Sequence, residues 1–332
     1  MSMSTTTEVL KLRVSSADML TADIRQLYLE PAVNGQALPA FTAGAHIALQ
    51  VSLPDGKTDW REYSLVALND TAAQAPVGYQ IAVRRETSGR GGSQFVHESI
   101  NVGDVLDVRA PRNQFPMENA NTSRAVLIAG GIGVTPIASM AAHCRQVGRP
   151  ISVYYAGRSR SLMAYLPELT ELAGPDLHVH ADDEQGKPLD VAGIFARLQA
   201  EDHVYFCGPT PMIDAILAMA EKQGWPRNQI HFELFSAPPA EDGDHPFEVE
   251  LAQSGKTLTI PTDKSILDVL IDEGFDPLYD CKRGECGVCA TDVLSGDIDH
   301  RDYILTAREK EAGNIMHTCV SRCKGSKLVL DM

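Results

Sequence analysis

Residues 281–289 read Cys-Lys-Arg-Gly-Glu-Cys-Gly-Val-Cys, and a fourth cysteine follows after 29 further residues. The spacing C-x4-C-x2-C with a distant fourth cysteine is the plant-type pattern for a [2Fe–2S] cluster. Three thiolates must converge from one tight loop, which Gly284 and Gly287 allow the backbone to form. The predicted ligands are Cys281, Cys286, Cys289 and Cys319.

A structural zinc site and unpaired core cysteines are the alternatives to the cluster. Zinc sites more often pair one C-x2-C with a second C-x2-C or with H-x3-H, and the sequence has no such second pair. Cys323 lies four residues beyond Cys319 and is an alternative ligand, but the motif does not need it. Cys144 and Cys207, in the middle of the chain, are expected to be packing residues.

The composition is that of a globular protein with two or three domains, because 44% of the 332 residues are hydrophobic and 22% are charged. The net charge of −15 argues against binding to nucleic acid or to anionic lipid. Of this charge, −9 lies beyond residue 235, where there are 10 basic and 19 acidic residues.

The cysteine count and the apolar runs indicate the compartment. Seven cysteines, five of them in the last 52 residues, make a poor disulfide framework. The polar start MSMSTTTEVL has no apolar core of a signal peptide, and no apolar run approaches the roughly 20 residues that cross a bilayer. We expect a soluble protein of a reducing compartment, the cytoplasm, without a membrane partner.

Residues 1–116 have the pattern of a small antiparallel barrel or sandwich. Short apolar or alternating segments are separated by turn residues such as PDGK and NVGD. The expected strands are 10–17, 23–30, 46–53, 63–68, 79–85 and 105–111.

In residues 117–235, predicted apolar strands alternate with predicted amphipathic helices. This order predicts a doubly wound parallel α/β sheet. Residues 236–246, SAPPAEDGDHP, have the composition of a linker. Residues 247–332 are expected to begin with a hairpin and a helix and to end with a strand after the cysteine-rich loop.

Two turns in the middle region have the features of a dinucleotide site. Gly130-Gly131-Ile132-Gly133-Val134-Thr135-Pro136 joins a predicted strand to a helix, and Cys207-Gly208-Pro209 does the same about 75 residues later. Small residues let the backbone approach a diphosphate, and the helix start supplies oriented amides. Tight packing of the turn is the alternative explanation for the glycines. The presence of a second turn of this kind favours a crevice between the two turns in which a dinucleotide binds.

Two groups of residues in the first region point to a phosphate. Arg61-Glu62-Tyr63-Ser64 is expected to begin a strand and offers a cation, a flat aromatic ring and a hydroxyl. Arg90-Gly91-Gly92-Ser93 precedes a predicted helix and combines a guanidinium, two flexible glycines and a capping serine, which together make a phosphate nest. A surface turn is the alternative for the second group.

The chain resembles the phthalate dioxygenase reductase family, which includes the reductase of vanillate O-demethylase, over essentially its whole length. The motifs that carry the resemblance are REYSL at 61–65, IAVRR at 81–85, GRGGS at 89–93, GGIGVTP at 130–136, CGP at 207–209, HFELF at 231–235, CKRGECGVC at 281–289 and HTCVSR at 317–322. The resemblance implies an antiparallel flavin-binding β-barrel, a doubly wound NAD-binding domain and a C-terminal β-grasp ferredoxin domain.

The resemblance also implies roles for individual residues. Arg61, Tyr63 and Ser64 hold the flavin, the backbone of Ala82, Val83 and Arg84 contacts its pyrimidine edge, and Arg90, Gly91, Gly92 and Ser93 take its phosphate. Thr135 lies near both flavin and nicotinamide, Phe235 stacks on the flavin ring, and Cys207 sits beside the transferred hydride. The remaining nucleotide-binding residues are Gly131, Gly133, Pro136, Arg158, Asp182, Gly208 and Pro209.

The expected cofactors are FMN, the cluster and NADH. The resemblance implies FMN, because in this branch of the family the RGGS nest ends the cofactor at one phosphate. The spacing of the residues alone does not exclude FAD. NADPH remains an alternative donor because Arg158 and Arg160, which flank Ser159 after one strand, are able to hold a 2′-phosphate. Against this, Asp182 and Asp183 after the next strand would repel that phosphate and accept hydrogen bonds from ribose hydroxyls.

Three functions are consistent with these motifs. The first is a monomeric, cytoplasmic reductase that passes electrons from NADH through FMN and the cluster to a Rieske-type oxygenase of aromatic catabolism. The second is an FAD-dependent NADPH reductase for another one-electron acceptor. The third is a zinc-stabilised adaptor without enzymatic activity.

Overall fold

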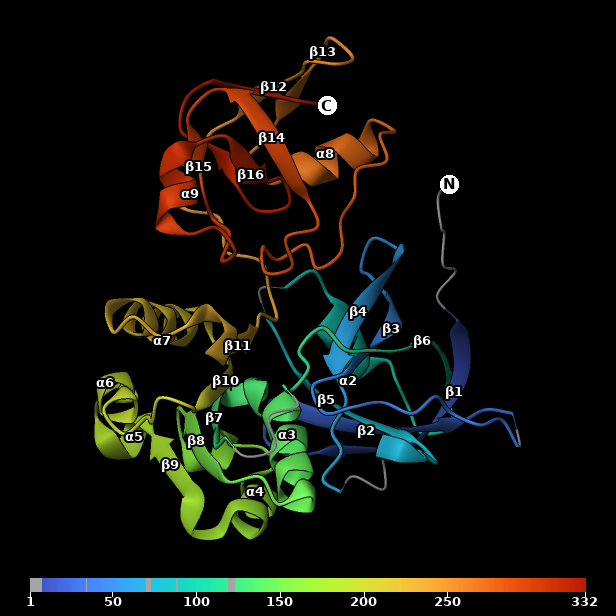
Figure 1. The fold of residues 1–332 in the computed structure, drawn as a ribbon. Coiled ribbons are helices and arrows are strands. Elements are labelled where there is room, and N and C mark those ends of the chain that lie inside the picture. The colour runs from blue at the N-terminus through green and yellow to red at the C-terminus, as the bar shows by residue number, and fades with distance from the viewer. Residues whose placement is uncertain (1–7, 34, 70–72, 88, 119–122) are drawn as a thin grey trace. The chain divides into compact units, whose positions relative to one another are not determined.

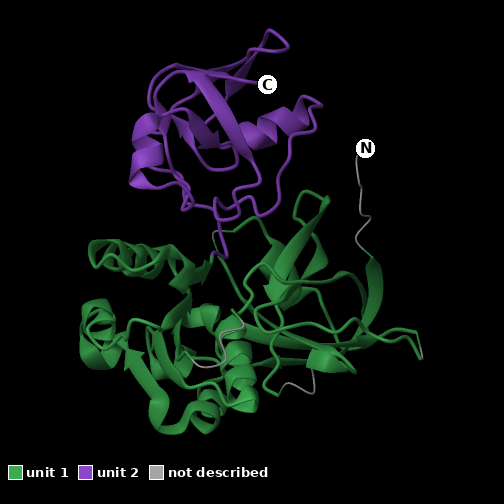
Figure 2. Ribbon diagram, in the orientation of Figure 1, with its two compact units in different colours: residues 1–233 green, residues 234–332 purple. Residues whose placement is uncertain are grey.

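A computed structural model describes residues 8–33, 35–69, 73–87, 89–118 and 123–332. The prediction that no signal peptide is present concerns residues 1–7, which lie outside the described ranges. Figure 2 divides the chain into two compact units, residues 1–233 and residues 234–332. None of the helices in the described ranges is long and apolar enough to cross a membrane.

The first part of unit 1 is a six-stranded antiparallel sheet in the order β4-β3-β6-β1-β2-β5. Its edge strands β4 and β5 meet at an isolated bridge between Leu65 and Ile81, and a backbone hydrogen bond joins Val66 to Gln80. The sheet is therefore barrel-like and has an apolar interior. In the described residues, its edge strands β4 and β5 are not joined by a continuous ladder of hydrogen bonds. The strands are β1 Val9–Met19, β2 Ile24–Pro31, β3 His46–Ser52, β4 Thr58–Ser64, β5 Tyr79–Arg84 and β6 Val105–Arg112, and helix α2 spans Gly92–Glu98.

The fourth strand differs from its prediction. It spans Thr58–Ser64 rather than 63–68, so Arg61, Tyr63 and Ser64 end a strand instead of beginning one. The sequence signal is weak because most residues of this edge strand are polar and only partly buried, whereas the apolar run 65–68 is a buried connection that follows it. Strands are recognised from one buried face, and β4 hardly shows one.

The second part of unit 1 is a parallel five-stranded sheet in the order β11-β10-β7-β8-β9. Helices α3 and α4 lie on one face, and α6 and α7 lie on the other (Figure 1), which confirms the doubly wound prediction. The strands are β7 Ala125–Gly130, β8 Ile151–Gly157, β9 Leu177–Ala181, β10 His203–Cys207 and β11 Ile230–Glu233. The helices are α3 Val134–Val147, α4 Leu166–Ala173, α5 Asp182–Gln185, α6 Val191–Phe195 and α7 Thr210–Lys222.

The barrel has an apolar interior of its own, and a second apolar cluster joins it to the parallel sheet. Barrel residues Ile24, Ala82 and Phe115 pack with the parallel strands and with α3. The Ser139 hydroxyl of α3 donates to the Leu65 carbonyl at 2.8 Å and accepts from the Ala67 amide at 2.9 Å. Helix α3 therefore fixes the end of β4 against the parallel sheet.

Unit 2 is a β-grasp fold that confirms the predicted hairpin, helix and final strand. Its sheet has the order β13-β12-β18-β14-β16, with β12 parallel to β18. Ser265 and Asp268 form a capping box that starts α8, which buries one face. The strands are β12 Phe247–Leu251, β13 Lys256–Ile260, β14 Ala290–Ser295, β15 Ile298–Asp299, β16 Ile315–His317, β17 Arg322–Cys323 and β18 Lys327–Leu330. The helices are α8 Ile266–Asp272 and α9 Ala307–Ala312.

The last residues of the predicted linker are held by unit 2. The Arg301 guanidinium donates to both carboxylate oxygens of Asp244, and each of these side chains is only 9% exposed. A ring nitrogen of His245 lies 2.8 Å from the Gly325 carbonyl oxygen, and the Arg322 guanidinium donates to the His245 carbonyl. Asp244 and His245 therefore belong structurally to the β-grasp unit.

This anchor predicts a pH-dependent contribution to stability. The hydrogen bonds from Arg301 hold the pKa of Asp244 at about 2, below its usual 3.8. The stabilisation is present above pH 4 and is lost as the pH falls towards 2. At pH 7, Asp244→Asn is expected to lower the free energy of unfolding of unit 2 by about 2 kcal/mol, measured by thermal denaturation of the full chain.

The control for this prediction is Asp263→Asn, which neutralises an exposed acid of the same unit. Equal melting temperatures for the two variants at pH 7 would contradict the anchoring role of Asp244.

Candidate active site and metal centre

The two predicted turns of the parallel sheet touch each other through their backbones. They follow β7 and β10, the neighbouring strands at which the strand order reverses. A Cβ built on Gly133 would lie 2.1 Å from the Cys207 carbonyl oxygen, and one on Gly208 would lie 3.0 Å from Gly130 Cα. Glycine is required at position 133 because a Cβ would overlap the backbone, and a Cβ at position 208 would be tight against the backbone of Gly130. The crevice at such a reversal point is where α/β sheets bind dinucleotides.

A buried carboxylate lies beside this crevice. Cys207 pairs in register with Glu233 of β11, and both residues are buried. The Ser64 hydroxyl, at the end of β4, donates to Glu233 Oε2 at 3.4 Å. The structure thus brings together Ser64 of the barrel and Cys207 of the parallel sheet around a carboxylate that sequence analysis missed. Glu233 lies in the HFELF motif, but its pairing with Cys207 depends on strand order.

Thr135 and Pro136 begin α3 directly after the glycine turn. The Thr135 hydroxyl donates to the Ile132 carbonyl at 3.0 Å, and its side chain is buried. Ser139 follows one helical turn later and bonds the Leu65 carbonyl next to Ser64. The start of α3 is therefore held near the end of β4, as a site between flavin and nicotinamide requires.

Arg61 and the RGGS segment form one cradle in the barrel. A Cβ on Gly92 would lie 3.0 Å from Arg61 Nε, so the guanidinium packs directly on this glycine. Arg61 Nη1 bonds Asp59 and the Trp60 carbonyl, whereas Nη2 is buried and has no hydrogen-bond partner in the described residues. A buried donor without a partner beside a glycine-rich segment fits a phosphate oxygen.

The predicted capping role of Ser93 is wrong. Gly91 caps α2 in the left-handed conformation, with φ of 91°, which a residue with a Cβ adopts only at a cost. Ser93 lies inside the helix, and its hydroxyl accepts from the Glu86 amide at 3.0 Å. It ties the RGGS segment to the chain just after β5.

The other predicted flavin residues lie on β4 and β5. Tyr63 packs against the barrel core, and burial raises the pKa of its hydroxyl to about 12, so the ring remains neutral. Ala82 and Val83 are buried in β5, an edge strand whose backbone groups alternately point away from β2. Arg84 bonds Glu86, and its guanidinium lies 3.9 Å from the Cβ position of Gly131.

The predicted contacts to the far end of the nucleotide lie at the same edge of the sheet. Arg158 follows β8 and Asp182 follows β9, and these strands are parallel neighbours. The Asp183 amide donates to the Arg158 carbonyl at 3.1 Å, which joins the two loops. Phe235 lies in the other unit, where its side chain is 41% exposed, and its stacking on the flavin stays a prediction.

The four predicted ligand cysteines form two pairs of thiols. The Cys286 thiol interacts with Cys281, and the Cys289 thiol interacts with Cys319. In the described residues, no three metal-binding side chains converge on one point where a single ion would sit. Two thiol pairs fit a two-iron cluster, in which each iron takes two thiolates, better than a mononuclear zinc site.

The loop that carries three of these cysteines has an unusual backbone. Gly284, Gly287 and Lys282 have φ of 83°, 78° and 56°. A Cβ on Gly284 would lie 2.8 Å from the Val320 side chain, so the loop packs closely on the segment around Cys319. The Arg283 amide donates to Cys281 Sγ at 3.3 Å, the type of bond that stabilises a thiolate ligand.

The environment of the second pair favours a thiolate at Cys289 and raises the pKa of Cys319. The hydrogen bond from Cys319 lowers the pKa of Cys289 to about 6, despite burial. His317, next to this pair, lies 3.5 Å from the buried carboxylate of Asp302. Burial opposes ionisation of Asp302, but His317 and the Leu305 amide outweigh it and hold its pKa at about 2.

Glu285 is a second residue that sequence analysis missed. It lies between Gly284 and Cys286, and its Oε2 accepts from the Leu234 amide at 2.7 Å. The Arg283 guanidinium bonds the other carboxylate oxygen at 3.1 Å, and both side chains are nearly buried. This carboxylate therefore fixes the shape of the cysteine loop and the backbone of Leu234.

Cys323 is buried in the core of the β-grasp sheet with residues such as Phe247 and Met316, whereas Cys289 and Cys319 pack with Leu267 and Val320. Cys144 lies on the buried side of α3, and burial raises the pKa of its thiol to about 11. Both are therefore packing residues.

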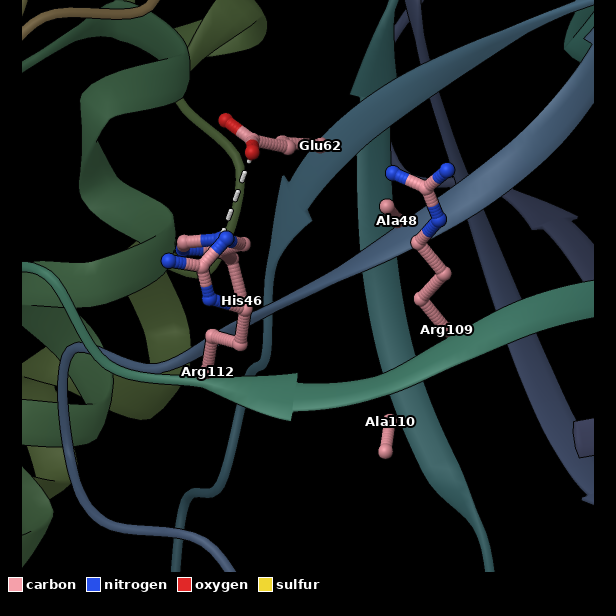
Figure 3. A pocket seen from close by; sticks show the side chains of 6 residues that line it. All are labelled: His46, Ala48, Glu62, Arg109, Ala110 and Arg112. Atoms are coloured by element: carbon pink, nitrogen blue, oxygen red, sulfur yellow. Dashed lines mark ion pairs between the residues drawn. The ribbon is translucent and has the colours of Figure 1, made fainter. Parts of the chain in front are cut away.

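A small pocket of the barrel lies between β3, β4 and β6 and has no residue in common with the predicted sites. Figure 3 shows His46 Nε2 and Glu62 Oε1, 3.5 Å apart, at one side of it. Its lining residues are His46, Ala48, Glu62, Arg109, Ala110 and Arg112.

Comparison with known proteins agrees with this geometry. Three family models match: an oxidoreductase FAD-binding domain at residues 11–116, an oxidoreductase NAD-binding domain at 127–217 and a 2Fe-2S iron-sulfur cluster binding domain at 249–324. The fold and these matches define a flavin- and NAD-binding oxidoreductase with a plant-type ferredoxin domain.

Full-length relatives specify the family. The chain is 40% identical to a toluene-4-sulfonate monooxygenase system reductase subunit of Comamonas testosteroni, covering 98% of both chains. It is 38% identical to phthalate dioxygenase reductase of Burkholderia cepacia, covering 97% of both. A solved structure of phthalate dioxygenase reductase matches with a TM-score of 0.72, 36% identity and 98% coverage of both chains. The chain belongs to the phthalate dioxygenase reductase family of oxygenase reductases.

The thiol pairs predict which cysteines the cluster needs. Cys319→Ser is expected to remove one ligand and to abolish the visible absorption and the electron paramagnetic resonance signal of the reduced cluster. Cys323→Ser is expected to retain both because its thiol lies in the apolar core. Loss of the cluster in Cys323→Ser, with the β-grasp unit still folded by circular dichroism, would contradict the ligand assignment.

Proposed function

We propose that the chain is the reductase component of a Rieske-type oxygenase and passes electrons from NADH through FMN and a [2Fe–2S] cluster to that oxygenase. The observation that carries the proposal is the presence, in one chain, of a dinucleotide crevice beside a flavin cradle and of two thiol pairs that fit a two-iron cluster. The bound flavin supplies the conversion between a two-electron donor and a one-electron acceptor.

The residues described above have the following proposed roles. Arg61 and Gly92 bind the flavin phosphate, and Tyr63 lies against the flavin ring. The turns at Gly133 and Cys207 admit the nucleotide backbone, with no side chain in the way. Ser64, Cys207 and Glu233 line the place of hydride transfer, where the buried carboxylate orients the Ser64 hydroxyl. Phe235 covers the ring and yields to the nicotinamide.

FMN is the proposed flavin because the cradle of Arg61 and the RGGS segment fits one phosphate. The mass of the flavin released from the purified protein by heating measures this directly. We expect FMN, and release of FAD would contradict the assignment and favour the alternative reductase.

NADH is the proposed donor because the loop after β9 carries three consecutive acids, Asp182, Asp183 and Glu184, close to the loop that carries Arg158. A carboxylate accepts hydrogen bonds from ribose hydroxyls and repels a 2′-phosphate.

The proposed partner is the oxygenase component, and the acidic charge beyond residue 235 suits a basic surface on it. A monomer in the cytoplasm is sufficient for this role, because one chain contains all three cofactor sites.

The function is tested by interrupting the electron path at the cluster. Cys286→Ser is expected to leave anaerobic reduction of the flavin by NADH unchanged, because the crevice is intact. Reduction of cytochrome c, a one-electron acceptor, is expected to fall at least about tenfold because the cluster is lost.

Cys323→Ser serves as the control and is expected to retain both rates. If Cys286→Ser also retains cytochrome c reduction, the cluster is not on the electron path. If the purified protein shows neither flavin nor cluster absorption, the adaptor hypothesis replaces the reductase.

A further inference from the structure

An ion pair joins the loops after β8 and β9. Arg160 begins the short helical turn Arg160–Leu162, and Glu184 lies in α5. Arg160 Nε donates to Glu184 Oε1 at 2.8 Å, and both side chains are about half exposed. This contact lies next to the hydrogen bond between the Asp183 amide and the Arg158 carbonyl.

The position of the pair matters because β8 and β9 are parallel and end at the same edge of the sheet as the glycine turn after β7. In a doubly wound sheet, the ribose of the adenosine is bound at the end of the strand beyond the glycine turn, where an acid selects NAD and an arginine accommodates NADP. The loops here contain both kinds of residue.

We infer that Glu184 sets the preference for NADH over NADPH by occupying the guanidinium of Arg160. Arg160 is the cation of this edge that would otherwise pair with a 2′-phosphate, since arginine binds phosphate through its fork of N–H groups. With Glu184 in place, its Nε is already bonded and its charge is balanced. This inference rests on the proposed nucleotide site and adds a residue that decides which nucleotide the site accepts.

The other two acids of α5, Asp182 and Asp183, also disfavour a 2′-phosphate. Asp182 lies 3.2 Å from His180 Nε2, and Asp183 is exposed beside it. The three acids of α5 exceed the two arginines of the facing loop by one charge. A 2′-phosphate adds two negative charges here, whereas a ribose hydroxyl adds none.

The test compares the two nucleotides in the full-length holoprotein. Glu184→Gln keeps the shape and removes the charge, and Glu184→Ala removes the carboxylate. Both are expected to raise kcat/KM for NADPH about fivefold, the upper end of what an exposed ion pair contributes, while kcat/KM for NADH stays within about twofold. The dissociation constant of 2′,5′-ADP is expected to fall by a similar factor, and that of 5′-AMP is expected to stay unchanged.

Two further variants separate this role from a general effect of charge. Glu221→Gln removes the same charge from the exposed end of α7, which lies on the side of the sheet away from β8 and β9. It is expected to leave kcat/KM unchanged for both NADH and NADPH. Adding Arg160→Ala to Glu184→Ala is expected to cancel the gain for NADPH, because the guanidinium that binds the phosphate is gone.

The outcomes distinguish this inference from the proposed donor. If the unmodified protein prefers NADH but the Glu184 variants gain nothing for NADPH or 2′,5′-ADP, the role of Glu184 is wrong and the donor assignment stands. If the unmodified protein prefers NADPH, both are wrong. An equal gain for Glu221→Gln would also overturn the inference, because net charge would then be the cause.

Discussion

The backbone contact between the turns after β7 and β10 is the constraint on which the rest of the first unit depends. Gly133 lies so close to the Cys207 carbonyl that no other residue fits, and a Cβ on Gly208 would lie 3.0 Å from Gly130 Cα. The contact fixes the two strand ends at the point of reversal. It also determines which residues surround the crevice, because β11 pairs with β10 and thereby sets Glu233 beside Cys207. The Ser64 hydroxyl then reaches the same carboxylate from the barrel.

Much of this arrangement could be predicted from the sequence, because periodicity and glycine positions are local signals. The parallel strands, their helices and the cysteine spacing are visible along the chain. The edge strand Thr58–Ser64 was misplaced because it lacks a clearly buried face. Glu233 and Glu285 were missed for a different reason. Their partners, Cys207 and Leu234, are 26 and 51 residues away in the sequence, and only strand pairing or loop packing brings them together. The pairing of four thiols as two and two is likewise a property of the folded loop.

Both units bury a carboxylate. In the first unit, Glu233 is buried and accepts a hydrogen bond from the Ser64 hydroxyl. In the second unit, Asp302 is buried with His317 and receives the amides of Ile304 and Leu305. A carboxylate that receives several donors stays ionised, so Asp302 is a fixed negative charge beside His317, which lies two residues before Cys319.

The anchoring of Asp244 by Arg301 has a consequence for the evolution of such chains. The matched ferredoxin model begins at residue 249, but the folded β-grasp unit includes Asp244 and His245. A recombination breakpoint within residues 236–243 would transfer the ferredoxin with its ion pairs complete. A breakpoint a few residues later would leave Arg301 buried without that carboxylate, at the cost of a broken buried pair. Gene fusions that move this module between proteins should therefore retain the acidic residue upstream of the first strand, although it lies outside the sequence region by which the module is recognised.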